Sequence, residues 1–117
     1  LIFDTEDYDT DGMHDLVVDP DRITIKTAGT YLIVFHGHFA PNATGYRRCY
    51  IYRTTRVIAE TRKDAQALTW TCFDLSTIYQ CTVGEYLRIR VRQNSGAPLN
   101  FERASHYTPF FMAQRIG

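Results

Sequence analysis

Apolar and polar side chains alternate along much of this chain of 117 residues, and a period of two predicts β-strands rather than helices. The pattern is clearest in two stretches that open with a glycine and continue with aromatic and aliphatic residues, Gly29–Phe35 and Gly84–Val91. Clusters of turn residues at 41–45 and 94–98 separate alternating segments. We therefore expect strands at residues 1–5, 22–26, 30–39, 46–52, 56–61, 68–82, 85–93, 99–103 and 110–116.

The fold class follows from the number and shortness of these strands. Eight Tyr, seven Phe and one Trp, with many Val, Ile and Thr, suit pleated and half-buried surfaces. Short strands at this spacing indicate an all-β protein, either a sandwich or a jelly roll of two antiparallel sheets. The length is that of one domain, so we expect a single domain over residues 1–117. Both faces of the 30–39 strand are largely apolar, which predicts burial on both sides.

Acidic residues are concentrated at the N-terminus, although the net charge of the chain is zero. Eight of the 13 acidic residues lie within residues 1–21, before the first basic residue, Arg22. This acidic segment, residues 1–21, can be attracted to a basic surface of the same chain or of a neighbouring copy. A solvated acidic loop is the alternative interpretation.

Several strand motifs point to a known family. Gly29, Tyr31 and Phe35 match a signature of glycine, tyrosine and phenylalanine at alternate positions, with Ile33 where a phenylalanine is usual. On these residues, on Gly84-Glu85-Tyr86 and on the 105–112 segment, the chain resembles the globular heads of the complement first component. That family shares its trimeric jelly roll with the tumour necrosis factor ligands. Residues 8–15, 22–25, 42–48, 93–96 and 113–117 look like the version found in tailed bacteriophages and environmental viruses.

The resemblance implies a homotrimer, which would bury the apolar surface that one sandwich core does not need. The alternative is that the aromatic side chains simply fill the core of one chain. Our candidates for the trimer interface are Tyr31, Phe35, Tyr107, Phe110 and Phe111. The chain contains no collagen-like stalk, which disfavours a complement-type extracellular protein.

The acidic segment contains the first half of a calcium loop. Asp7, Asp9 and Asp11 provide oxygen ligands at alternate positions, and Gly12 suits the sharp turn. Val18 stands where an EF-hand has its bidentate glutamate, so the segment is not an EF-hand. A looser calcium site formed with Asp15, and a solvated turn, remain the two interpretations; we expect no cofactor and assign no metal.

Catalytic patterns are weak throughout. His36-Gly37-His38 is the His-x-His that cupin jelly rolls use to hold a metal, but the glutamate and the second histidine motif of a cupin are missing. The alternative is that both histidines are polar side chains at a strand end, stacked around a trimer axis. No Gly-x-Ser-x-Gly motif is present, so we expect no enzyme activity.

The arginines bear on which partners the chain could bind, and the cysteines bear on the cellular compartment in which it is made. Arg88, Arg90 and Arg92 share one strand face and could bind nucleic acid or an anionic glycan, but the neutral charge balance favours pairing with the acidic segment, so we expect no nucleic-acid partner. Three cysteines, an odd number without a CxxC motif, favour reduced thiols made in a cytoplasm, with one cross-strand pair as the alternative. The chain contains no run of about 18 apolar residues, so we expect no membrane insertion.

The sequence thus predicts a non-enzymatic virion protein, a trimeric decoration or cement protein on the head of a bacteriophage, made in the bacterial cytoplasm and located on the virion surface. Its partners would be its own copies and the major capsid protein, contacted through the acidic segment. The alternative is a receptor-binding head domain on a head or tail fibre. There the partners would be the fibre shaft and host glycan, with Asn42, Tyr46 and Asn94 as candidate receptor contacts.

Overall fold

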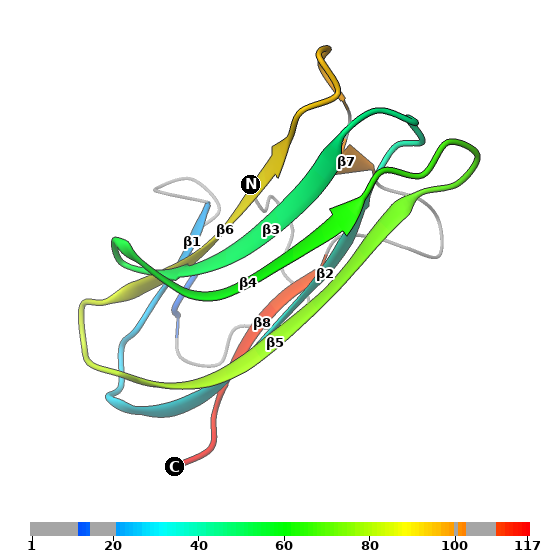
Figure 1. Ribbon diagram of the computed structural model, residues 1–117. Coiled ribbons are helices and arrows are strands. Elements are labelled where there is room, and N and C mark those ends of the chain that lie inside the picture. The colour runs from blue at the N-terminus through cyan, green and yellow to red at the C-terminus, as the bar shows by residue number, and fades with distance from the viewer. Residues whose placement is uncertain (1–11, 15–20, 100, 103–109) are drawn as a thin grey trace.

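The computed structural model describes residues 12–14, 21–99, 101–102 and 110–117, and these form an all-β protein of two antiparallel sheets (Figure 1). The strands of the described residues are β1 (Arg22–Thr24), β2 (Gly29–Phe39), β3 (Tyr46–Arg53), β4 (Arg56–Asp64), β5 (Thr71–Cys81), β6 (Tyr86–Gln93), β7 (Phe101–Glu102) and β8 (Phe110–Arg115).

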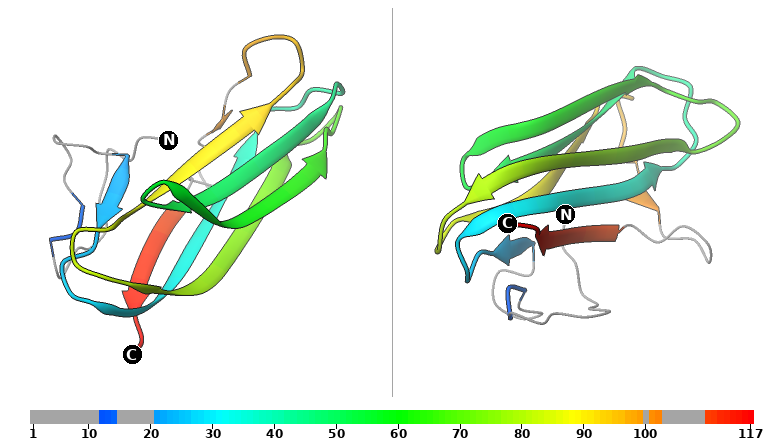
Figure 2. Two further views of the ribbon diagram at one scale, coloured as in Figure 1. Left: turned by 60° about the vertical axis from the view of Figure 1, so that its left-hand side comes forward. Right: turned by 90° about the horizontal axis from the view of Figure 1, so that it is seen from below.

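The two sheets stack as an open sandwich, which Figure 2 shows from two further sides. One sheet, here called the β3 sheet, has the strand order β1-β6-β3-β4. The other, the β2 sheet, has the order β5-β2-β7, and β8 also pairs with β2. The longest ladder joins β2 to β5 and runs from Gly29–Cys81 to Phe39–Thr71. The expected all-β sandwich of two antiparallel sheets is confirmed.

Alternate residues of both sheets meet in one core. On β2 the buried side chains that face the other sheet are Tyr31, Ile33, Phe35 and Phe39, at alternate positions with Gly37 between the last two. The β3 sheet contributes buried side chains at the same period, among them Cys49, Ile51, Leu87 and Ile89. Since successive residues of a strand point to opposite faces, the alternation in the sequence is itself what fills this core.

The composition of the 30–39 strand predicts that both of its faces are buried. In the structure, over most of the strand, this holds only for the face that meets the other sheet. Tyr31, Ile33 and Phe35 lie between the sheets, whereas Leu32, Val34 and His36 point to the outer face and are only half-buried. His38 at the end of the strand is the exception on this outer face, because Trp70 stacks on it and it is 1% exposed. The apolar character of the second face is therefore a property of the sheet surface. It does not reflect a third layer among the described elements.

Most expected strand positions agree with the structure to within a few residues. The largest differences are three residues: β4 continues to Asp64 and not to residue 61, and β5 begins at Thr71 and not at residue 68, because residues 65–70 form a loop whose Leu68 side chain is 97% exposed. Thr69 and Trp70 have high strand propensity, so the local sequence does not indicate this loop. The expected strand at 1–5 lies outside the described residues. In the described part of the chain no helix is long and apolar enough to cross a membrane.

Candidate functional site

Three loops gather at one end of the sandwich, in the upper part of Figure 1. They are the β2–β3 loop (residues 40–45), the β4–β5 loop (65–70) and the β6–β7 loop from residue 94 onward. Antiparallel pairing brings these connections to the same end of the sandwich. We call this end of the sandwich the loop end; it contains two of the predicted receptor contacts, Asn42 and Asn94, and it borders the third, Tyr46.

A buried arginine holds the first of these loops. Arg47 occupies an inward position of β3, and its side chain is 0% exposed. Its Nη1 donates to the carbonyl oxygens of Thr44 and Tyr46, both at 2.9 Å, and its Nη2 donates to the carbonyl oxygen of Asn42 at 3.2 Å. Burial lowers the pKa of this guanidinium from its usual value. Arg47 is thus an internal brace for the loop backbone.

Hydrogen bonds also tie the three loops to one another. The side-chain oxygen of Asn94 accepts a bond from the backbone N–H of Tyr46 at 2.6 Å, which joins the β6–β7 loop to β3. The Asn42 N–H donates to the Gln66 carbonyl at 2.9 Å, and the Ala65 N–H donates to the Gly45 carbonyl at 3.1 Å. The loop end is therefore a connected structure, and the Asn94 oxygen that could contact a receptor already has a partner within the chain.

Gly45 is required at the contact with Asn94. Its φ of +80° lies in the region that only glycine adopts easily, and a Cβ added there would overlap the Asn94 side-chain oxygen. The Asn42 side-chain oxygen accepts a bond from the Thr44 N–H at 2.9 Å, a local turn bond that further fixes the loop. Of the three predicted receptor contacts, the two asparagines thus have structural roles through their side-chain oxygens.

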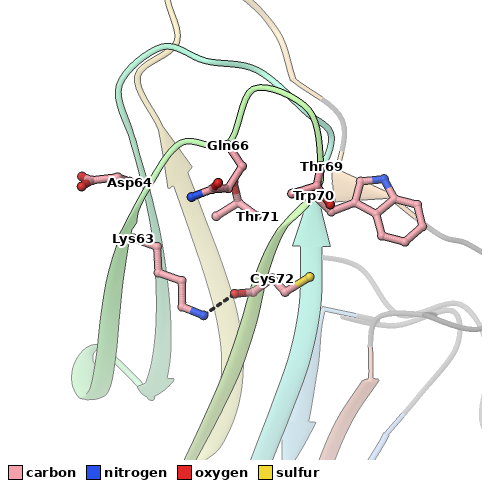
Figure 3. Close-up of a pocket in the computed structure, with 7 residues that line it drawn as sticks. All are labelled: Lys63, Asp64, Gln66, Thr69, Trp70, Thr71 and Cys72. Atoms are coloured by element: carbon pink, nitrogen blue, oxygen red, sulfur yellow. Dashed lines mark hydrogen bonds between the residues drawn. The ribbon is translucent and has the colours of Figure 1, made fainter.

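A shallow open depression lies beside the β4–β5 loop, where the edges of the two sheets meet (Figure 3). Lys63 of β4 donates to the carbonyl oxygen of Cys72 of β5 at 2.6 Å and so links the two edges. The lining residues are Lys63, Asp64, Gln66, Thr69, Trp70, Thr71 and Cys72. Figure 3 shows the Trp70 indole pointing away from Asp64, on the side where it stacks on His38, so the polar groups and the indole do not converge on one point.

The outer face of the β2 sheet is the second surface of interest. Directly paired residues share a face, so Leu32 of β2 lies beside Ile78 of β5, and Val34 lies beside Met112 of β8. Ile78 is 58% exposed, and Leu32, Val34, Phe110 and Met112 are half-buried. We call these five residues the outer apolar face.

The structure places most predicted trimer contacts elsewhere. Tyr31 and Phe35 are 1% and 0% exposed between the two sheets, so both belong to the core of the single chain and cannot contact a second copy. Phe111 pairs with Phe35 and packs against the same core. Phe110, which pairs with outward-facing His36, is on the outer apolar face. Tyr107 lies outside the described residues.

The two histidines of the His-x-His motif also point to the outer side of the β2 sheet, and each has an aromatic neighbour. His36 stacks on Phe110 with ring centroids 5.2 Å apart, and His38 stacks on Trp70 at 4.4 Å. Within the described residues no group of three His, Cys, Asp or Glu side chains could hold a metal ion. The motif is thus engaged in packing. The candidate calcium ligands Asp7, Asp9, Asp11 and Asp15 all lie outside the described residues.

At the opposite end of the sandwich, Glu85 closes the turn before β6. Its side chain accepts bonds from the Oγ1 and the N–H of Thr82, both at 2.7 Å, and approaches Arg53 at 3.2 Å. These contacts, those from Thr82 above all, lower the pKa of the Glu85 carboxyl. The cluster stabilises a turn and is not arranged as a reactive site.

All three cysteines are free, as the odd number predicts. Cys72 is exposed, whereas Cys49 and Cys81 are buried in the core. Burial raises the pKa of the Cys49 thiol from 9.0 to about 12 and also raises that of Cys81. A buried thiol with a raised pKa is a poor nucleophile, because the thiolate is the reactive form.

We expect one thiol per native chain, Cys72, to react with a thiol-specific reagent at neutral pH, and three after unfolding.

The raised pKa of Cys49 also links stability to pH. Its contribution is fully present below pH 9 and is lost as the pH rises toward 12, because the unfolded thiol releases its proton near 9.0 and the folded one does not. Urea unfolding at pH 8 and pH 10.5 should show this loss, and a Cys49→Val variant should show less of it.

Two features of the loop end were not predicted from the sequence. Arg47 stands on the same strand face as Cys49 and Ile51, so the period of two already placed a charged residue at an inward position. Trp70 was assigned to the 68–82 strand, because Thr69 and Trp70 are strand-forming residues. A signal in the sequence was thus present for Arg47 but not for Trp70. No family model and no curated protein matches this chain.

Proposed function

We propose that the protein is a non-enzymatic structural component of a bacteriophage virion, a homotrimeric jelly-roll module that decorates and stabilises the head. The fold supports this proposal, because an all-β sandwich of two antiparallel sheets is the fold class that the motifs around Gly29 and Gly84 imply. The proposed role in a virion rests on the resemblance described above, and the proposed assembly rests on the surfaces of the sandwich.

The observation that carries the proposal is the outer apolar face of the β2 sheet. Monomeric proteins rarely expose large contiguous apolar patches, and those that exist usually contact a partner. Here aliphatic and aromatic side chains from β2, β5 and β8 lie next to one another on a regular sheet, and one of them, Ile78, is 58% exposed. A cyclic homotrimer would place three copies of this face around one axis and remove it from water.

A trimer of this kind would act as a cement by occupying a three-fold position between capsid subunits. Its binding to the assembled head, and not to separated subunits, would stabilise the head by mass action without any chemical step. Attachment would use the acidic segment against the capsid protein or a neighbouring subunit. The virion surface is the corresponding location.

The proposal is tested by Ile78→Asp, which introduces a charge into the outer apolar face. We expect this variant to be a folded monomer by light scattering at micromolar concentration, where the unaltered chain is a trimer, because an unpaired charge strongly disfavours an apolar interface. We also expect it to lose binding to phage heads stripped of their decoration, measured by co-sedimentation.

Val83→Asp is the matched control. Val83 is 64% exposed but lies in the β5–β6 turn, away from the outer apolar face, so its replacement should leave both the trimer and head binding unchanged. A monomeric unaltered chain, or an Ile78→Asp variant that stays trimeric, would contradict the trimer. A trimer that does not bind heads would contradict the decoration role alone.

The second candidate function, the receptor-binding tip of a fibre, is favoured by the loop end. The braced loops present Leu68, which is 97% exposed, beside a depression that contains Trp70. A rigid loop surface with an exposed apolar tip suits the contact of a fibre with a host glycan or receptor. Trimer binding to host cells and not to stripped heads, lost in Leu68→Ser, would identify this function.

A further inference from the structure

The outer face of the β3 sheet is dominated by arginines. Arg88, Arg90 and Arg92 occupy alternate positions of β6, and Arg48 of β3 lies between Arg92 of β6 and Arg62 of β4. Arg22 of β1 pairs with Arg88 at the other edge. The carboxylates that the same register places on this face are Glu60 and Asp64, and Asp21 forms an ion pair with Arg22 Nε at 3.7 Å. We call this surface the arginine face; it consists of Arg22, Arg48, Arg62, Arg88, Arg90 and Arg92.

Tyrosines separate the arginines and keep their charged groups at the surface. The guanidinium of Arg22 lies 4.0 Å from the ring centre of Tyr86, that of Arg62 lies 4.4 Å from Tyr46, and that of Arg88 lies 5.3 Å from Tyr52. Such contacts hold the planar cations against aromatic faces, and an arginine held in this way can still donate hydrogen bonds to anions in the plane of its guanidinium. The ring faces are thus already occupied, which disfavours the stacking of nucleic acid bases.

Like charges placed directly opposite one another across a sheet are unfavourable. Arg48 has an arginine as its direct neighbour on both adjacent strands, and its ion pair with Glu60 is long, at 3.8 Å. A ligand that brings several carboxylates to this face would relieve the repulsion and form charge-assisted hydrogen bonds. The arginine face therefore suits an acidic partner.

The spacing of the arginines identifies the form of that partner. Residues two apart on a strand are separated by about 6.6 Å, which is the spacing along β6 of Arg88, Arg90 and Arg92. An extended peptide with an acidic residue at every second position has the same spacing. The sequence of this chain contains one such peptide, Asp7-Tyr8-Asp9-Thr10-Asp11, which lies outside the described residues and enters here through its sequence alone.

We propose that the arginine face is a docking surface for the acidic Asp7–Asp11 stretch of a second copy of this chain. The charges agree as well as the spacing, because residues 1–21 contain acidic but no basic residues, while all 13 basic residues follow. The arginine face belongs to the β3 sheet and the outer apolar face to the β2 sheet, so the two contacts use opposite surfaces of the sandwich. The proposal does not depend on the trimer or on the virion.

The test uses full-length chains and a fluorescent peptide of residues 1–14. The chain is added to the labelled peptide, and binding is followed by fluorescence anisotropy at about 150 mM salt, a near-physiological value. The chain used is the variant Asp7→Asn/Asp9→Asn/Asp11→Asn, because its own stretch has lost its charges and cannot compete with the peptide. We expect binding that weakens at least about tenfold when Arg90→Gln and Arg92→Gln are added. The matched control, Lys26→Gln/Arg56→Gln, removes two exposed charges outside the arginine face and should not weaken binding.

Two competitors identify the occupant. Unlabelled Arg90→Gln/Arg92→Gln chain, which keeps the acidic stretch, should displace the peptide, and the Asp-to-Asn chain should not. A peptide of equal composition with its acidic residues contiguous should bind more weakly. Equal binding of that peptide, tighter binding of single-stranded DNA or a sulfated polysaccharide, failure of the chain to compete, or an equal loss in the lysine–arginine control would each overturn the proposal.

Discussion

Phe35→Ala is expected to destabilise the protein by roughly 3–5 kcal/mol, the usual cost of removing a buried phenylalanine. The side chain is 0% exposed, it pairs with Leu75 on one side and Phe111 on the other, and both neighbours pack against the same core. Alanine would leave a cavity, because the two sheets cannot move together far enough to fill the space of the phenylalanine ring. The thermal midpoint measured by circular dichroism should fall by more than about 10 °C, and urea unfolding should give the loss of free energy directly.

Val34→Ala is the control for this result. Val34 is the preceding residue of β2, but it points to the outer apolar face and is half-buried, so its truncation should cost the single chain less than about 1.5 kcal/mol. The two variants should also differ in their dependence on protein concentration. The loss in Phe35→Ala should be the same at every concentration, because the cavity forms within one chain, whereas a loss at a subunit contact depends on concentration. Equal effects in both variants would contradict the assignment of Phe35 to the core.

The contrast between these neighbours shows what the sequence could and could not predict. The period of two identified β2 and its two faces, and a shift of one residue exchanges those faces. Both faces carry apolar residues, so composition alone could not decide which face meets the other sheet and which meets solvent or a partner. The stacking of the two sheets decides it: the face with the Phe35–Phe111 pair packs into the core, and the face with the Val34–Met112 pair does not. Such a pairing joins segments 76 residues apart and leaves no local mark in the sequence.

The loop end was predicted in position but not in mechanism. Turn residues at 41–45 and 94–98 placed two loops correctly, because glycine, proline and asparagine favour turns for local reasons. The bond from the Tyr46 N–H to the Asn94 side chain could not be predicted, since it depends on how the two sheets bring these loops together. A candidate receptor contact at Asn94 thus proved to be a structural link. The Arg88, Arg90 and Arg92 alternation, by contrast, is a local pattern and was evident from the sequence.

Arg47→Met is expected to be the most damaging change at the loop end. Methionine occupies about the space of the aliphatic part of the arginine side chain but removes the guanidinium and its three donated bonds to the carbonyl oxygens of Asn42, Thr44 and Tyr46. A buried acceptor left without a donor costs roughly 1–3 kcal/mol, whereas removal of the buried charge returns part of that cost, as the lowered pKa of Arg47 indicates. We expect a net loss of about 2–4 kcal/mol.

The distinctive result of this change should be local. Hydrogen exchange at the amides of Asn42, Tyr46 and Ala65, which bond between the loops, should accelerate well before that of the β2–β5 ladder, because the brace acts on the loops first. Arg47→Lys should share most of the loss, since one ammonium group cannot reproduce the fixed geometry of a guanidinium that donates from two nitrogens. Arg48→Met, one residue along on the opposite face, should leave loop exchange unchanged. If Arg47→Met accelerated exchange equally in the loops and in the ladder, Arg47 would be a general core residue and the loop end would not be a separately braced unit.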